Sequence, residues 1–187
     1  MSMSPPENLH AANPDDAAQT LHIPLIAGYR PDGEGIVEQV AVTPVPNDGK
    51  SKSANAAAQY RLLRSPAFVR GLAAGDKISF PADTDEGYEL VQRSGNLCLR
   101  VLSKSNIDDV LQVLTPEIEL LDGILDIETP RLLVYSIHVS IGFQAIELLL
   151  DRISGQFAGT LWYYGNVYDP ADGVTPLDWW QAFLAPV

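Results

Sequence analysis

Apolar and polar residues alternate in short runs through the first half of the chain, which is the pattern of β-strands. Two runs rich in Ile and Val, residues 21–29 and 36–45, are separated by the turn-like sequence RPDGEG. Residues 97–104 repeat again with the period of two that a strand requires. We therefore expect residues 21–104 to form an antiparallel, small barrel-like β region, preceded by a flexible, acidic leader at residues 1–20.

The period of the pattern changes halfway along the chain, where helical segments begin to alternate with strands. Asp108 and Asp109 fall in the first turn of one amphipathic segment, and negative side chains favour that end of a helix. Residues 131–139 are strand-like, residues 141–153 carry a second apolar helical stripe, and an aromatic strand follows. This β-α-β-α-β order, with an added hairpin near GILDIETPRLL as an option, predicts an α+β fold in which residues 97–168 form a ferredoxin-like unit sharing its first strand with the β region.

Large aromatic residues gather near the C-terminus, where Trp179 and Trp180 follow a Thr-Pro pair typical of a helix start. Aromatic side chains anchor many binding surfaces, and they also fill cores. Adjacent helical residues point about 100° apart, so the two indoles are not expected to bury on one face. Residues 169–187 are therefore predicted to be a C-terminal aromatic segment that uses these tryptophans for packing or for binding a partner.

The composition, with 46% hydrophobic and 19% charged residues, is that of a globular protein. The N-terminus lacks the basic and apolar regions of a signal peptide. The most apolar window, residues 131–154, is interrupted by Ser, His, Gln and Glu before it supplies the roughly 20 apolar residues of a membrane span. A single cysteine, Cys98, excludes an intramolecular disulfide. These features predict a cytoplasmic protein without a membrane segment.

The formal net charge of -12 is concentrated in the second half of the chain. From Ser105 onward, twelve Asp or Glu residues are balanced only by Arg131 and Arg152. Such a field repels nucleic-acid phosphates and attracts a basic protein, although an acidic surface also keeps a protein soluble without any partner. We expect a basic protein partner, and no nucleic acid, to be bound by the two tryptophans and by Asp108, Asp109, Glu117 and Glu119.

Two adjoining motifs stand out between the predicted strands. The first, PAFVRGLAAGDKI, contains Pro66, Phe68, Gly71, Gly75 and Asp76, and the second, RSGNLCLR, contains Arg93, Ser94, Gly95 and Arg100. Over roughly residues 21–168 the chain resembles the uncharacterised bacterial family named domain of unknown function 4265, whose motifs are similar to P-F-F-x-x-G-x-x-x-G-D-x-V and R-S-G-H-S-T-x-R. Asn96 stands at the histidine position, which removes the imidazole that a proton-transfer mechanism would need there. The resemblance implies a fold and a pair of motifs, and no activity.

The second motif is a candidate binding site as well as a candidate turn. Arg93 and Arg100 flank a tight polar turn, and guanidinium groups bind carboxylates and phosphates bidentately. The same Ser-Gly-Asn sequence is also an ordinary hairpin connection. The candidate residues for binding an anion at or beside this turn are Arg93, Ser94, Asn96, Arg100, Arg70 and Asp76.

The first motif has the residues of a fixed turn. Gly71 and Gly75 permit positive φ, and Asp76 brackets the turn before the next strand. A functional interpretation instead places Arg70 and Asp76 exposed on the rim of a cleft. Both interpretations stay open at this point.

Signatures of catalysis are few. The histidines His10, His22 and His138 lack metal-ligand spacing, and no phosphate loop or dinucleotide-binding glycine motif occurs. Cys98 and His138 could meet on neighbouring strands, but a buried strand cysteine is usually inert. We expect no metal and no cofactor, and favour a non-catalytic binding module of immunity or antitoxin type that neutralises a basic protein. The alternative is a small anionic-ligand-binding protein, or an enzyme, that uses the turn from Arg93 to Asn96.

Overall fold

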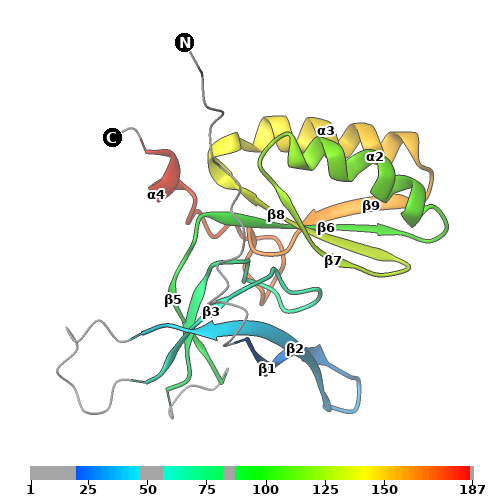
Figure 1. Cartoon of the computed structure of the whole chain (residues 1–187). Coiled ribbons are helices and arrows are strands. Elements are labelled where there is room, and N and C mark those ends of the chain that lie inside the picture. The colour runs from blue at the N-terminus through cyan, green and yellow to red at the C-terminus, as the bar shows by residue number, and fades with distance from the viewer. Residues whose placement is uncertain (1–19, 47–56, 82–86, 186–187) are drawn as a thin grey trace.

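The protein folds into two antiparallel sheets that are joined through loops, and two helices cover the outer face of one sheet (Figure 1). The computed structural model describes residues 20–46, 57–81 and 87–185, so the expected leader lies outside the described residues except for Thr20. The α+β class is confirmed. No helix in these ranges is long and apolar enough to cross a membrane.

The elements follow the chain in a β-rich half and a mixed half. The first sheet contains β1 (Leu21–Tyr29), β2 (Gly35–Pro44), β3 (Gln59–Leu62), β4 (Lys77–Ser79) and β5 (Glu89–Gln92). The second half contains β6 (Asn96–Ser103), α2 (Ile107–Glu119), β7 (Ile124–Glu128), β8 (Leu132–His138), the 3₁₀ turn η1 (Val139–Ile141), α3 (Phe143–Gln156), β9 (Thr160–Tyr164) and α4 (Gln181–Leu184).

The first sheet is a meander in which each strand pairs with the next, in the order β1-β2-β3-β4-β5. The edges are β1 and β5, so the pairing of the described residues leaves this sheet open and does not produce the expected barrel-like closure. A β-bulge interrupts the pairing of β1 with β2 between Ile26 and Gly28. Leu25, Val42 and Ile78 belong to the core on the inner face of this sheet.

The second sheet has the strand order β7-β8-β6-β9, with α2 and α3 on one face (Figure 1). The hairpin strand β7, an option in the sequence, is present and turns the expected order into β-α-β-β-α-β. Both hydrogen-bonded neighbours of β6, which are β8 and β9, belong to this sheet. The strands expected at residues 97–104 and 131–139 therefore lie in one sheet, as the predicted unit requires, and they pair as neighbours.

The helix α2 begins with Asp108 and Asp109 in its first turn and continues through Pro116. Proline supplies no N–H for the carbonyl of Gln112, one turn earlier. Because Gln112 lies on the exposed side of the helix, water can satisfy that carbonyl. Thr115 and Pro116 therefore both lie inside one continuous helix.

The central strands β6 and β8 are buried on both faces, which explains their nearly continuous apolar sequences. Leu97, Leu99 and Val101 pack with α2 and α3 in the main core. The alternate residues of β6, among them Cys98 and Arg100, point to the opposite face, where the loops of the first motif cover them. A polar side chain on this strand is therefore in the protein interior.

Gly165 lies where this packing is closest. A Cβ atom added to it would come 2.6 Å from the Cys98 sulfur and 3.0 Å from the guanidinium carbon of Arg100. We predict that Gly165→Ala lowers the free energy of unfolding by about 1–3 kcal/mol through overpacking. The matched control is Gly155→Ala in α3, where a Cβ would meet nothing within 4 Å and should be neutral or stabilising. Urea unfolding of both variants checks this, and equal effects would contradict it.

Candidate functional site

The first motif folds around a buried arginine. Arg100 is 1% exposed, and its guanidinium donates hydrogen bonds to backbone carbonyls of the loop 66–69. Nη2 lies 3.0 Å from the carbonyl oxygen of Pro66 and 2.5 Å from that of Val69. The guanidinium also lies over the Tyr163 ring, 5.7 Å from its centroid. Arg100 therefore holds the loop and does not present its charge to solvent.

A carboxylate binds the N–H groups of the same loop. Glu38 of β2 accepts hydrogen bonds from the backbone N–H groups of Ala67, Phe68 and Val69, at 2.6, 2.8 and 2.9 Å. Three successive N–H groups directed at one anion form a backbone nest, which favours negative charge. Glu38 belongs to the first sheet and Arg100 to the second. The loop 66–69 thus lies between an acid from one sheet and a base from the other, and this clamp joins the two sheets.

Glu38 was not among the residues singled out by the sequence, although a signal exists. It lies two and four residues before Val40 and Val42 in β2, so it points to the same face as these two valines, which are buried in the core. A charged residue at an inward position of a strand requires a buried partner. The partner, a backbone nest about thirty residues further on, has no composition of its own that a sequence would reveal.

The two motifs interlock through Asp76. This side chain is buried, and Oδ1 accepts the Ser94 N–H at 2.8 Å, while Oδ2 accepts the Ala73 N–H at 3.0 Å. Burial raises the pKa of Asp76, and the bonds from Ser94 and Ala73 oppose that rise. The cleft-rim interpretation of Asp76 is therefore wrong, because the carboxylate is enclosed and fastens one motif to the other.

The remaining polar groups of the turn are bonded inside the protein. Asn96 Nδ2 and Ser94 Oγ both donate to the Ala74 carbonyl, at 2.9 and 2.7 Å. Arg93 Nη1 donates to the Gly71 carbonyl at 2.8 Å and lies 3.6 Å from Asp76 Oδ2. Gly75 has φ +83°, and a Cβ there would lie 2.8 Å from the Ser94 Cβ, so the close approach of the two motifs requires glycine.

The expected anion grip by two arginines does not form in this structure. Arg93 and Arg100 flank the turn in sequence, but each guanidinium is bonded to a different set of carbonyls. Arg93 lies over the Trp179 ring, 5.1 Å from its centroid, and burial lowers its pKa. The residues singled out by the sequence therefore lie close together, and in this structure they fasten the two motifs to each other. Arg70 differs from them, because its side chain is exposed.

A second polar cluster lies between the sheets, around Asp126 of β7. Its Oδ2 accepts hydrogen bonds from the Ser65 N–H at 2.9 Å and from the Ser136 hydroxyl. The hydroxyls of Ser65 and Ser136 lie 2.7 Å apart, and Ser65 Oγ also accepts the Ala74 N–H. Burial raises the pKa of Asp126, while these bonds lower it. The cluster combines a carboxylate with two serine hydroxyls, and Ser65 is 0% exposed, which keeps substrates away from it.

The pair of Cys98 and His138 does not form. In the register of β6 with β8, His138 lies opposite Asn96, and Cys98 lies opposite Ser136. Cys98 is fully buried, and desolvation raises the pKa of its thiol to about 11. The thiol is therefore protonated at neutral pH and is a poor nucleophile. Within the described residues, no cluster of His, Cys, Asp or Glu could hold a metal ion.

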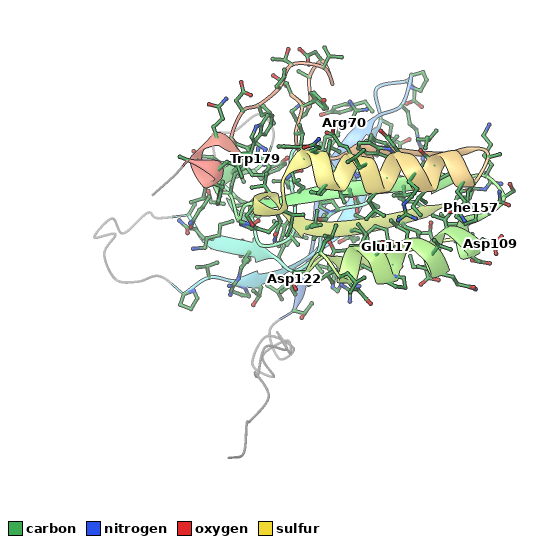
Figure 2. All side chains as sticks on the ribbon, turned by 90° about the horizontal axis from the view of Figure 1, so that it is seen from above. Arg70, Asp109, Glu117, Asp122, Phe157 and Trp179 are labelled. Carbon is green, nitrogen blue, oxygen red and sulfur yellow. The ribbon has the colours of Figure 1, made fainter. Side chains whose placement is uncertain are left out.

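The acidic residues lie along α2 and its C-terminal end, where Figure 2 labels Asp109, Glu117 and Asp122. Asp108, Asp109 and Glu119 are exposed. Glu117 pairs with Arg152 of α3 at 2.9 Å, so a local ion pair offsets part of its charge. Asp108 and Glu119 are eleven residues apart, which is about 16 Å along a helix. The carboxylates thus lie in the first turn of α2, at Asp108 and Asp109, and in its last turn, at Glu117 and Glu119, and we call them the acidic edge of α2.

The C-terminal tryptophans pack against the main core and remain partly exposed. Trp179 donates its indole N–H to the Asn166 carbonyl at 2.8 Å. Trp180 meets the Phe143 ring edge to face, with 5.2 Å between the centroids. Because they precede α4 in a turn, both rings reach the core, and the divergence expected within a helix does not apply.

The chain belongs to the family described as "Domain of unknown function (DUF4265)", whose model matches residues 53–160. A solved structure, described as a novel crystal structure of a hypothetical protein from Neisseria gonorrhoeae, is similar with a TM-score of 0.55 and 14% identity. The similarity covers 79% of this chain and 93% of that one, and at this identity it shows the fold alone. No curated protein matches the chain.

The clamp on the loop 66–69 makes a prediction about stability. Glu38→Ala leaves three N–H groups without their carboxylate, and Arg100→Met leaves the loop carbonyls without their donor, so each should cost about 2–4 kcal/mol of unfolding free energy. Both side chains hold the same loop, so the double variant should lose less than the sum, by at least about 0.5 kcal/mol. Urea unfolding of the cycle measures this.

The control for that cycle is Arg61→Met, which removes an exposed arginine from β3. It should change the unfolding free energy by no more than about 0.5 kcal/mol and be additive with Glu38→Ala. Strict additivity of Glu38→Ala and Arg100→Met would show that the loop does not couple the two charges.

Asp126 gives a prediction about pH. Its pKa is raised in the folded protein, so the native state binds the proton more tightly than the unfolded chain does. Its contribution to stability is therefore fully present below the ordinary value of 3.8 and is lost as pH rises through the native pKa. The unfolding free energy of wild type minus that of Asp126→Asn should fall over that pH range. Urea unfolding as a function of pH tests this against Asp109→Asn, and a difference that grows with pH contradicts it.

Proposed function

We propose that this protein is a non-catalytic binding module that docks a basic protein through the edge formed by α2 and β7. The observation that carries the proposal is the run of exposed carboxylates on α2, of which Asp108, Asp109 and Glu119 have no cationic partner within the described ranges. A field that local ion pairs leave uncancelled accelerates association with an oppositely charged partner.

Exposed apolar residues lie beside these carboxylates. Leu120 is 82% exposed and lies between Glu119 and Asp122 in the sequence. Ile124 is 59% exposed and follows two residues after Asp122. Binding surfaces commonly combine apolar anchors with a polar rim. Leu120 and Ile124 supply such anchors at the acidic edge, whereas Trp179 and Trp180 are already packed against the core of their own chain. These features support an immunity or antitoxin-like role in the cytoplasm, in which the partner is a basic protein.

The fold supports the proposal by presenting this edge rigidly. We place the helix-covered half in the ferredoxin-like class, because its β-α-β-β-α-β order and the sheet order β7-β8-β6-β9 correspond to that arrangement. In such a layer the helices are fixed by the sheet beneath them, and α2 is held through Val110, Leu114 and Ile118. The runner-up role, binding of an anion by the Arg93 turn, has less support because that turn is bonded internally.

The test neutralises the acidic edge without adding cations to the first turn of α2. The triple variant Asp108→Asn, Asp109→Asn, Glu119→Gln should slow association with a partner captured from the source organism by about tenfold at low salt. The control triple variant, Asp32→Asn, Glu34→Gln, Glu89→Gln, removes the same formal charge from exposed positions in the β1–β2 turn, where Glu34 pairs with Arg30, and in β5. Surface plasmon resonance at a series of salt concentrations gives the rates.

Leu120→Ser should instead raise the dissociation rate and leave the association rate nearly unchanged, because an apolar anchor contributes after the partner has docked. If both triple variants slow association equally, net charge rather than the α2 edge attracts the partner. If neither does, the acidity serves solubility alone.

A further inference from the structure

A surface pocket of about 480 Å³ lies between β1, the loop of the first motif and the segment 169–171. Ile26 and Tyr29 line it from β1. Arg70 lines it from the first motif, and Tyr88 lines it from the position directly before β5. Figure 2 labels Arg70 beside the β1–β2 hairpin and the loop that follows β9. The volume is that of a small-molecule site. This pocket is separate from the acidic edge on α2.

Arg70 supplies a positive charge to the pocket, whose lining also contains the carboxylate of Asp169. Within the described part of the chain its side chain makes no hydrogen bond or ion pair. The acidic residue in the lining is Asp169, and its Oδ1 accepts the Ala171 N–H of its own turn at 2.8 Å. The neighbouring arginines of the two motifs, Arg93 and Arg100, are bonded to carbonyls. Arg70 is therefore the motif arginine whose donors are available to a ligand.

The walls of the pocket are apolar and aromatic. Tyr29 is 67% exposed and Ile26 is 45% exposed, although both are large side chains that gain free energy when covered. The β-bulge between Ile26 and Gly28 shifts the end of β1 at this place, and bulges commonly re-aim side chains beside binding sites. Pro170 lines the pocket from the other loop.

The two loops that carry Arg70 and Pro170 are fastened together. The Gly71 N–H donates to the Gly165 carbonyl at 2.8 Å, and a Cβ on Gly71 would come 3.1 Å from Pro170. On the other side of Arg70, the Val69 N–H is held by Glu38. The backbone on both sides of Arg70 is thus fixed before any ligand arrives, which lowers the entropy cost of binding.

From this arrangement we infer that the pocket binds a small molecule carrying a carboxylate or phosphate on an aromatic or apolar body. Arg70 donates paired hydrogen bonds to the anionic group, since a guanidinium matches the geometry of these anions. Tyr29 and Ile26 contact the body of the ligand. The clamp on the loop 66–69 then has a second effect, because it holds Arg70 in place.

The experiment uses the full chain and four probes, namely benzoate, phenyl phosphate, inorganic phosphate and the neutral benzyl alcohol. Amide shifts in two-dimensional NMR are followed during titration. Benzoate or phenyl phosphate should give saturable shifts at Tyr29, Arg70 and Ala171. Arg70→Gln should weaken this binding roughly tenfold, the loss expected when a charge-assisted hydrogen bond is removed. Arg131→Gln, an exposed arginine in the β7–β8 turn, removes the same charge elsewhere and should leave the binding unchanged.

Four results would overturn the inference. The first is the absence of saturable shifts at the pocket with both aromatic anions, and the second is equal binding by Arg70→Gln and wild type. The third is equal binding of benzyl alcohol and benzoate, which would mean that the pocket binds the aromatic ring and does not select for the negative charge. Binding of inorganic phosphate alone would also contradict the stated ligand class. Because Arg70→Gln leaves α2 unchanged, none of these results depends on the proposal for a basic partner.

Discussion

The structure depends on one short stretch of backbone that is held from both sides by opposite charges. The N–H groups of residues 67–69 bind the carboxylate of Glu38, and the carbonyls of Pro66, Phe68 and Val69 bind the guanidinium of Arg100. Each charge alone would be costly inside a protein. Here the peptide dipoles of the loop lie between them, so that each charge faces the complementary ends of the same peptide groups.

This arrangement explains why the two motifs have their particular residues. Asp76 and Ser94 join the motifs where Gly75 lets them approach, and Asn96 adds a bond to the same turn. Because their polar atoms are hydrogen-bonded within the protein, these residues fix the position of one motif against the other. The surface that remains for partners and ligands is then set by what the joint leaves outside, which includes the side chain of Arg70.

The sequence predicts the second half of the fold well and its contacts poorly. The change of period after β6 and the acidic first turn of α2 are local signals, and the elements they predict are present. The position of Arg100 was misjudged because alternation on a strand reveals two faces without telling whether the second face is covered. The partners of Glu38 and Asp126 depend on contacts across about 30 and 61 residues of sequence, and such contacts leave no periodic trace. The same limit explains why most residues of the expected ligand site, with the exception of Arg70, are bonded to groups of their own chain.

The clamp also bears on how the chain reaches its fold. Arg100 binds a loop 34 residues before it, and that loop binds Glu38, which lies 29 to 31 residues before it again. A ribosome has therefore delivered the whole first sheet before the residue that completes the clamp is available. Until then the loop carbonyls lack their donor, although the residues of the first sheet's apolar core, among them Leu25, Leu62 and Ile78, have all been synthesised. The clamp thus couples the loop of the first sheet to a strand of the second, although each sheet has a core and a strand order of its own.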